Sequence, residues 1–395
     1  MLCYYYPPVQ SSGTARSVAF SRLLPRLGWE PTVLTVRRAR ERWSSRHGAP
    51  PDGIRVVRSP EWDLTGLIDL LQGVTNRVFR FVGHGAPRNL YRQFLGFPDP
   101  QSAWLTVLPG VGLARAHHVV YASCPPFSSA VSALLIGVAA RRPVVLDFRD
   151  PWAYQLVPTF SQRYERAVLR LEALAVRRCD ALIVNTRGVQ GLYAKRYPFA
   201  AHKIVTIPNG YDDLTPVAAI EASAFRIVHA GTFYGGRDPI PLMEALLRIK
   251  DPRIEFVHVG EPYPALETYR GRIALHQLGL VPRHAALETV RSASLLYFCQ
   301  GPGHSLSIPA KAYEYLATGL PILAHCPEGD AAELVRTYGK NSTVVTSDGV
   351  ALEEAVRALL GRWPHTEPAI DPEFTRRHSR EELTRQLVHV LESVL

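Results

Sequence analysis

The chain has 395 residues, 47% apolar and 20% charged, so it can bury a large core and is not a disordered protein. Its 45 Lys and Arg exceed its 35 Asp and Glu by ten, a balance that favours anionic partners such as phosphorylated molecules, nucleic acid or an acidic membrane surface. The first 100 residues hold 14 Arg, no Lys and seven acidic residues, and so carry seven of the ten net charges.

Short apolar runs alternate with amphipathic segments through the first half of the chain. Strands are predicted at residues 2–5, 32–36, 54–57, 119–121, 144–148, 181–184 and 204–207. The runs are continuous and bounded by Gly, Pro or Asp, as in parallel sheets that are covered on both faces. Between them, a helix that tightens at Pro25 is expected to stop at Gly28, and a longer helix is expected at 163–178.

A second series of the same kind follows a polar stretch after Asn209-Gly210. Its strands are predicted at 225–229, 254–259, 295–298, 322–324 and 343–345, and its helices at 239–249, 310–318, 350–360 and 379–395. Two such series predict an α/β chain with two Rossmann-like domains. Open α/β sheets bind ligands at the carboxyl ends of their strands, so we expect the site in a cleft between the two domains.

The five Cys are widely separated and show no zinc-binding spacing, which predicts reduced thiols and a cytoplasmic location. The longest apolar run, residues 131–140, is about half of the ~18 residues that a membrane span needs. We therefore expect neither a membrane span nor a signal peptide.

Two strand-to-helix loops have the composition of phosphate sites. The first holds Ser11, Ser12, Gly13 and Thr14 before a helix N-terminus, where free N–H groups attract phosphate; an ordinary connecting loop is equally compatible. The second, residues 229–239, places Gly231, Gly235 and Gly236 before Arg237, which together predict a diphosphate site. A solvated Arg beside a flexible loop is the alternative.

Two further segments carry charged residues at strand or helix ends. Lys311 and Glu314 lie three residues apart at the start of a predicted helix, where Lys is unfavourable unless an anion binds. An exposed Lys–Glu pair is the simpler explanation. Arg149 and Asp150 follow a buried strand, where Asp150 is suited to orienting a hydroxyl group and Arg149 to holding an anionic group; a structural Arg–Asp pair is the alternative.

Seven segments in this order resemble the retaining glycosyltransferases of the family-four type, with the two-domain GT-B fold. The segments are YYPPVQSSGTARSVAFSRLLPRLGWEPTVLTV, SCPPFSS, VVLDFRDPW, CDALIVNT, IPNGYD, HAGTFYGGRDP and IPAKAYEYLATGLPI. The resemblance implies a subfamily-4-like acceptor domain at 1–211, a linker at 212–224, a group-1 donor domain at 225–375, and a helix at 376–395 that crosses back to the first domain.

The resemblance also implies roles for individual residues. Arg237 and Lys311 match the basic pair that holds the donor diphosphate, with Gly13, Gly231 and Gly236 beside it, and Glu314 matches the ribose-binding carboxylate. Arg237, Lys311 and Asp150 are the implied catalytic residues, and Arg149, Asp150 and Ser123 the implied acceptor-side residues. No metal or other cofactor is implied, because a nucleotide sugar is the co-substrate.

The sequence departs from the family pattern at several positions. Ser12 replaces the first Gly of the usual pair, and Arg237 stands where many members have Lys. The family often carries a further Glu upstream of the one that Glu314 matches, and we assign that position to Ser307. A His that often follows the fourth strand has no counterpart, and its role falls to Ser123 or to no residue.

The resulting prediction is a cytoplasmic transferase of polysaccharide biosynthesis that moves a sugar from a nucleotide donor to a saccharide, lipid-linked or small-molecule hydroxyl. A sugar-nucleotide epimerase of the same fold and a non-catalytic, membrane-associated partner of saccharide assembly are the alternatives; nucleic-acid binding is not expected. Residues 62–94 combine apolar residues with Arg77, Arg80, Arg88 and Arg92. They form either a peripheral contact with an anionic membrane or a helical insertion packed on the first domain.

Overall fold

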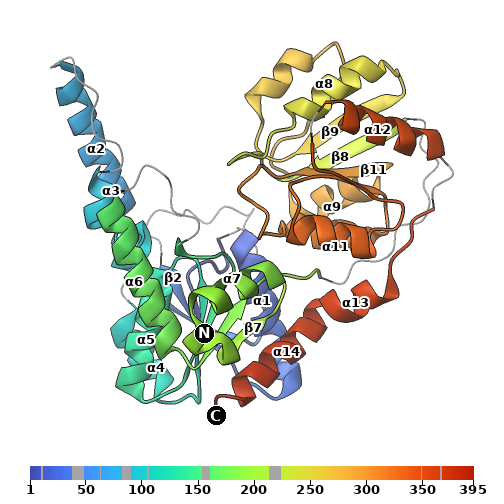
Figure 1. Cartoon of the computed structure of the whole chain (residues 1–395). Coiled ribbons are helices and arrows are strands. Elements are labelled where there is room, and N and C mark those ends of the chain that lie inside the picture. Colours follow the sequence, from blue (N-terminus) through green and yellow to red (C-terminus); the bar gives the residue numbers. More distant parts are fainter. Residues whose placement is uncertain are drawn as a thin grey trace. The chain divides into compact units, whose positions relative to one another are not determined.

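The structure is a computed structural model, and it describes residues 1–9, 12–37, 49–62, 64–81, 90–104, 106–153, 161–212, 224–347, 349–364 and 367–395. The chain forms two compact units (Figure 1). Unit 1 comprises Met1–Asn185, Val189–Pro208 and Thr384–Leu395, and unit 2 comprises Thr186–Gly188 and Asn209–Leu383. Most of the predicted linker, residues 213–223, lies outside the described residues, as does Ser11 of the first predicted phosphate loop.

Unit 1 is built on a seven-stranded sheet in the order β3-β2-β1-β4-β5-β6-β7, in which all neighbours are parallel. Its strands are β1 (Leu2–Cys3), β2 (Thr32–Arg37), β3 (Arg55–Pro60), β4 (Val120–Cys124), β5 (Val144–Phe148), β6 (Ala181–Val184) and β7 (Ile204–Thr206). The helices of this half are α1 (Ser12–Leu23), α2 (Leu64–Phe81), α3 (Leu90–Leu95), α4 (Val107–Ala114), α5 (Ser128–Ala140), α6 (Gln162–Arg178) and α7 (Arg187–Arg196).

The first helix ends as its sequence predicts. After α1, Leu24–Leu27 form a 3-10 turn with Pro25 near its start, and Gly28 closes it in the left-handed conformation with φ of 82°. Proline lacks the N–H that an α-helix needs, and glycine alone enters the left-handed region without a steric cost. The expected tightening and stop are confirmed.

The longest apolar run of the chain is a packed helix. It forms most of α5, whose Ala133 and Ile136 are fully buried. Among the described residues, no helix is long and apolar enough to span a membrane. All five cysteines are buried free thiols.

Unit 2 is built on a six-stranded parallel sheet in the order β10-β9-β8-β11-β12-β13. Its strands are β8 (Phe225–Ala230), β9 (Ile254–Val259), β10 (Ala274–Gln277), β11 (Leu295–Cys299), β12 (Ile322–His325) and β13 (Thr343–Val345). The helices are α8 (Ile240–Ile249), α9 (Arg283–Arg291), α10 (Ala310–Thr318), α11 (Asp330–Tyr338), α12 (Val350–Arg362), α13 (Pro372–His378) and α14 (Arg380–Glu392), which ends in unit 1.

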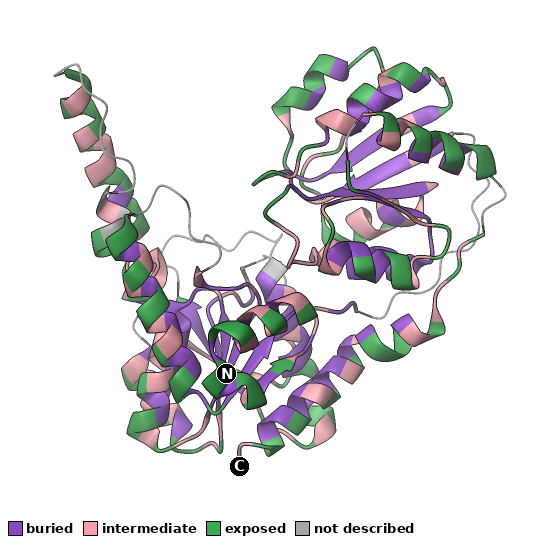
Figure 2. Cartoon of the chain, in the orientation of Figure 1, coloured by how far each residue is buried: buried purple, intermediate pink, exposed green. Residues whose placement is uncertain are grey.

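The central strands of unit 2 are buried on both faces, and Figure 2 shows them as the buried centre of the unit. Phe225 and Ile227 of β8 pack in the cluster that contains residues of α8 and α12, whereas Val228 packs in the cluster that contains residues of α10 and α11. Successive strand residues point to opposite faces, so two apolar faces require a continuous apolar run. The predicted fold class, with two Rossmann-like β/α/β domains, is confirmed.

Candidate active site

The central feature of unit 2 is a contact between Lys311 and His229. Lys311 lies in the first turn of α10, and its Nζ is 2.8 Å from Nε2 of His229, which lies near the end of β8. The other ring nitrogen, Nδ1, lies 3.0 Å from the carbonyl oxygen of Tyr297. A carbonyl only accepts, so Nδ1 carries the proton and Nε2 accepts from Lys311. The buried imidazole is therefore neutral.

The protonation of both groups follows from their surroundings. Burial, followed by the charge of Lys311, holds the pKa of His229 well below its usual value. Burial is also the main reason that the pKa of Lys311 falls to about 7, and the nearby charge of Arg237 lowers it further. A bound anion would offset the effects of burial and of Arg237 on the pKa of Lys311, because an opposite charge favours the protonated amine.

Gly231 provides the space in which the Lys311 amine lies. It directly follows β8 with φ of 124°, and a Cβ atom there would lie 2.7 Å from Lys311 Nζ. A side chain would therefore be strained and would displace the amine. The Gly231 carbonyl accepts a hydrogen bond of 3.0 Å from Nε2 of His258, while Phe233 stacks on His229 at 4.0 Å between ring centroids.

Arg237 adds a second cation to the same loop. Its guanidinium carbon lies 4.3 Å from the centre of the Tyr234 ring, and its Nε is buried without a hydrogen bond to a described residue. The neighbouring Gly236 has φ of 82°. Its backbone lies against Gly301, where an added Cβ atom would be only 2.6 Å from the Gly236 carbonyl oxygen. The loops after β8 and β11 therefore touch through their backbones beside Arg237.

Glu314 lies one turn after Lys311 and is engaged by another side chain. Its Oε1 accepts a hydrogen bond of 2.8 Å from Arg283, which also reaches Asp212 at 3.2 Å. These side chains are partly exposed, so the pairs contribute on the order of 1 kcal/mol or less. Ser307 instead lies in a local network, where it accepts from Gln300 at 3.1 Å and donates to the carbonyl of His304 at 3.1 Å.

Unit 1 brings two other predicted site residues together. Gly13 lies in the first turn of α1, and a Cβ atom there would clash with the guanidinium of Arg149. Arg149 is 8% exposed and donates to the carbonyl of Pro125 at 2.7 Å, while its Nε makes no hydrogen bond within the described residues. Ser123 is buried one residue before the end of β4, and its Oγ also makes no hydrogen bond within the described residues. Asp150 is half-buried two residues beyond β5.

A buried Arg–Asp pair does occur in this region, but it joins Arg16 to Asp147. Arg16 Nε lies 2.7 Å from Oδ2 and its second terminal nitrogen 3.1 Å from Oδ1, and both residues are at most 1% exposed. Tyr121 donates to the same carboxylate, and Arg16 also donates to the carbonyl of Pro208 at 2.5 Å. The pair ties α1 to β5, so its evident role is structural.

The family known as Glycosyltransferase Family 4 matches residues 12–213, just over half of the chain. The chain belongs to Glycosyltransferase Family 4. It is therefore a glycosyltransferase, and this membership favours sugar transfer over the epimerase and non-catalytic alternatives. No curated protein matches its sequence.

Several solved structures share the GT-B fold of this glycosyltransferase. Anabaena Alr3699/HepE in complex with UDP and glucose has 17% identity and a TM-score of 0.62, with 99% of each chain covered. A glycosyltransferase from Rickettsia africae has 12% identity and a TM-score of 0.60, covering 100% of this chain and 97% of the other. The lipopolysaccharide outer core galactosyltransferase WaaB has 13% identity and a TM-score of 0.57, with both chains fully covered.

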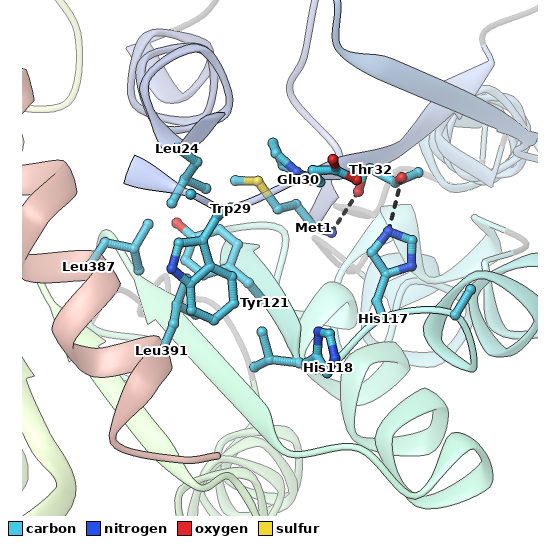
Figure 3. Close-up of a pocket in the computed structure, with 14 residues that line it drawn as sticks. Met1, Leu24, Trp29, Glu30, Thr32, His117, His118, Tyr121, Leu387 and Leu391 are labelled. Carbon is cyan, nitrogen blue, oxygen red and sulfur yellow. Dashed lines mark hydrogen bonds between the residues drawn. The ribbon is translucent and has the colours of Figure 1, made fainter. Parts of the chain in front are cut away.

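A pocket of about 340 Å³ opens in unit 1 of the glycosyltransferase, away from the predicted site residues Ser123 and Arg149 (Figure 3). Thr32 begins β2 and Val119 precedes β4, so the pocket lies at the amino ends of the strands, whereas Ser123 and Arg149 lie at the carboxyl ends. Trp29 and two leucines of α14 form its apolar wall, with His118 beside them. The sequence did not predict this pocket, because its walls come from distant segments.

The same limitation applies to the residues around Lys311. His229 and His258 are direct partners in the register of β8 and β9, but neither was selected from the sequence. The available signal was a His at the end of an apolar strand, immediately before a Gly-rich loop.

Within the described parts of this glycosyltransferase, no group of three or more His, Cys, Asp or Glu is placed to hold a metal ion.

Proposed function

We propose that this glycosyltransferase moves a sugar from a nucleoside-diphosphate sugar to an acceptor hydroxyl, with retention of anomeric configuration and without a metal ion. The observation that carries the proposal is the pair of cations Lys311 and Arg237, which lie near enough that the charge of Arg237 lowers the pKa of Lys311. Lys311 contacts a neutral imidazole, and Arg237 has a buried donor without a partner among the described residues. Two adjacent cations that lack a carboxylate partner in the described structure suit a diphosphate.

The proposed reaction needs stabilisation of a leaving group. The bond between the anomeric carbon and the diphosphate oxygen breaks, and the acceptor oxygen bonds to that carbon. The acceptor proton passes to the departing diphosphate. Negative charge grows on the diphosphate in the transition state, where Lys311 and Arg237 would stabilise it. Gly13 and Gly236 would allow close approach of backbone to phosphate, and Glu314 would accept from the ribose hydroxyls in place of Arg283.

The acceptor side is proposed to use Arg149, Asp150 and Ser123. Ser123 and Arg149 both carry buried polar atoms without a described hydrogen-bond partner, which supports a polar ligand at this edge of the sheet. We propose a saccharide, lipid-linked saccharide or small natural product as the acceptor and a C-terminal domain of the group-1 kind. Because Anabaena HepE was solved with UDP and with UDP-glucose, a UDP-sugar is the first donor to test.

A thermal-shift screen with nucleoside diphosphates and nucleotide sugars tests the donor site. We expect at least one nucleoside diphosphate to stabilise the wild type and to stabilise Arg237→Ala less. The control Arg253→Ala, which removes an exposed Arg elsewhere in unit 2, should respond like the wild type. Equal shifts in wild type and Arg237→Ala would remove Arg237 from the site, and no shift with any nucleotide would contradict the proposal.

Product analysis tests the chemistry. The anomeric proton of the product, followed by NMR, should show the configuration of the donor, and an excess of EDTA should leave the rate unchanged. An inverted product or a rate lost to EDTA would contradict the corresponding part of the proposal.

A further inference from the structure

Exposed apolar side chains gather on the insertion formed by α2 and α3. Twenty large apolar residues of the described chain are exposed, and eight of them fall between Trp62 and Leu95. Phe81 is 95% exposed, Phe94 76% and Trp62 69%. Scattered exposed apolar residues are ordinary, but a group of this kind marks an interaction surface.

Five of the eight lie on one side of α2. The α2 stripe consists of Leu67, Leu70, Val74, Val78 and Phe81, which are 44–95% exposed. Their spacing of three and four residues puts them on one face, and at about 1.5 Å per residue the stripe is roughly 21 Å long. In Figure 1 the far end of α2 extends away from the sheet of unit 1, and Figure 2 colours much of the helix as exposed.

A different face of α2 already serves the packing of unit 1. Ile68 is 3% exposed, and Thr75 Oγ1 lies 2.7 Å from the hydroxyl of Tyr91 in α3. At about 100° per residue, Ile68 and Thr75 lie about 100° or more from the centre of the α2 stripe. Among the residues that the structure describes, the apolar arc of α2 is therefore wider than its packing contacts use, and these contacts do not account for the α2 stripe.

The charges beside the α2 stripe indicate the kind of partner. Arg77 and Arg80 are exposed on the polar side, and Asp69 is the only acidic residue in the helix. The first 100 residues also carry a net charge of +7. Apolar residues beside Arg suit the boundary between lipid headgroups and acyl chains, where long cationic side chains reach the phosphates. A second copy of the chain would bring the same positive helix against itself.

We infer that α2 lies in the interface of an anionic membrane, with the α2 stripe among the acyl chains and Arg77 and Arg80 at the lipid phosphates. This inference is separate from the donor site, since vesicle binding needs neither nucleotide nor acceptor.

Flotation of the full-length protein with vesicles tests this inference. Wild type should bind vesicles of phosphatidylglycerol and phosphatidylcholine in equal parts, and bind pure phosphatidylcholine at least about tenfold less. Leu70→Ser/Val74→Ser/Phe81→Ser should weaken binding at least about tenfold, since three exposed apolar side chains no longer enter the membrane. The control Leu278→Ser/Leu280→Ser/Val350→Ser changes exposed apolar residues of unit 2 and should bind like wild type.

The basic residues are tested in the same way. Arg77→Gln/Arg80→Gln should lose about fivefold per Arg at low salt, and the loss should shrink as salt is added. A Phe81→Trp reporter should be quenched by brominated lipids beyond the quenching of the wild type. Circular dichroism and thermal melting establish that every variant is folded.

Three results would overturn the inference. They are failure of the wild type to bind anionic vesicles, unchanged binding by Leu70→Ser/Val74→Ser/Phe81→Ser (the triple stripe variant), and absence of extra quenching in Phe81→Trp. If light scattering shows a dimer that the triple stripe variant disrupts while wild type ignores vesicles, the α2 stripe is instead an interface between copies of this chain.

Discussion

The two units treat their buried and half-buried charges in different ways. In unit 1, Arg16 and Asp147 satisfy each other through two hydrogen bonds, and Tyr121 adds a third to the carboxylate. In unit 2, Lys311 contacts a neutral imidazole, and Arg237 keeps a buried donor without a described partner. The first arrangement is complete within the protein, whereas the second would become favourable only with a bound anion, as the proposed function requires.

This difference separates charges that stabilise the fold from charges available to a ligand. Removing one partner of a complete buried pair leaves an unpaired charge and costs stability. Removing an uncompensated cation relieves a desolvation cost and should leave the fold intact. The following experiments test that distinction, beginning with the largest expected effect.

Asp147→Ala should destabilise the protein by about 3–5 kcal/mol, because Arg16 would remain buried without its carboxylate. The free energy of unfolding from urea denaturation measures this effect. The matched control is Glu255→Ala, which breaks the partly exposed pair with Arg226 and should cost about 1 kcal/mol or less. Similar losses in the two variants would show that the Arg16–Asp147 pair is not structurally important.

Lys311→Met should reduce activity without reducing stability, the opposite of the effect expected for Asp147→Ala. We expect kcat/KM for transfer to fall by about 10²–10³, as when one donor to a developing charge is removed, with the thermal midpoint unchanged or raised. Calorimetric titration with a nucleoside diphosphate should show weakened binding. A strongly destabilised variant would place Lys311 with Arg16 as a residue of the fold.

The pH dependence of diphosphate binding follows from the lowered pKa of Lys311, about 7 in the free protein. A diphosphate favours the protonated amine, so above pH 7 binding must take up a proton and affinity should fall by up to about tenfold per pH unit. Calorimetry at pH 8 in two buffers of different ionisation enthalpy measures that uptake. Lys311→Met should lose it, and a wild type without proton uptake would contradict the assignment.

The same group affects folding in the other direction. Lys311 is neutral above pH 7 in the folded protein but stays charged in the unfolded chain up to its ordinary pKa of 10.5. The unfolded state thus binds more protons between these values, and this contribution to stability rises with pH. Lys311→Met should flatten that rise in the free energy of unfolding.

The smallest expected effect concerns His229 as a positioning residue. His229→Leu removes the acceptor that orients the Lys311 amine, whereas the amide oxygen of His229→Gln can replace it. We expect kcat to fall several-fold in His229→Leu and to recover partly in His229→Gln. Equal activities in the two variants would show that His229 only fills space.

Much of the architecture could be predicted because it depends on local pattern. β5 and α10 begin and end at the predicted residues, since apolar continuity and flanking Pro or Gly define them. β10 was missed because this edge strand buries only Leu275 and has no apolar run. The boundaries predicted for the domains and the roles predicted for the site residues remain predictions.

The sequence alone determined two Rossmann-like units, a Gly-rich loop with Arg237, a helix start with Lys311, and an apolar, Arg-containing segment after Trp62. Only the tertiary structure decided which charges are paired. Arg16 meets a carboxylate 131 positions away, and Lys311 meets an imidazole 82 positions away. The protonation of a buried group depends on its desolvation and its neighbours in space, and neither can be derived from the order of residues along the chain.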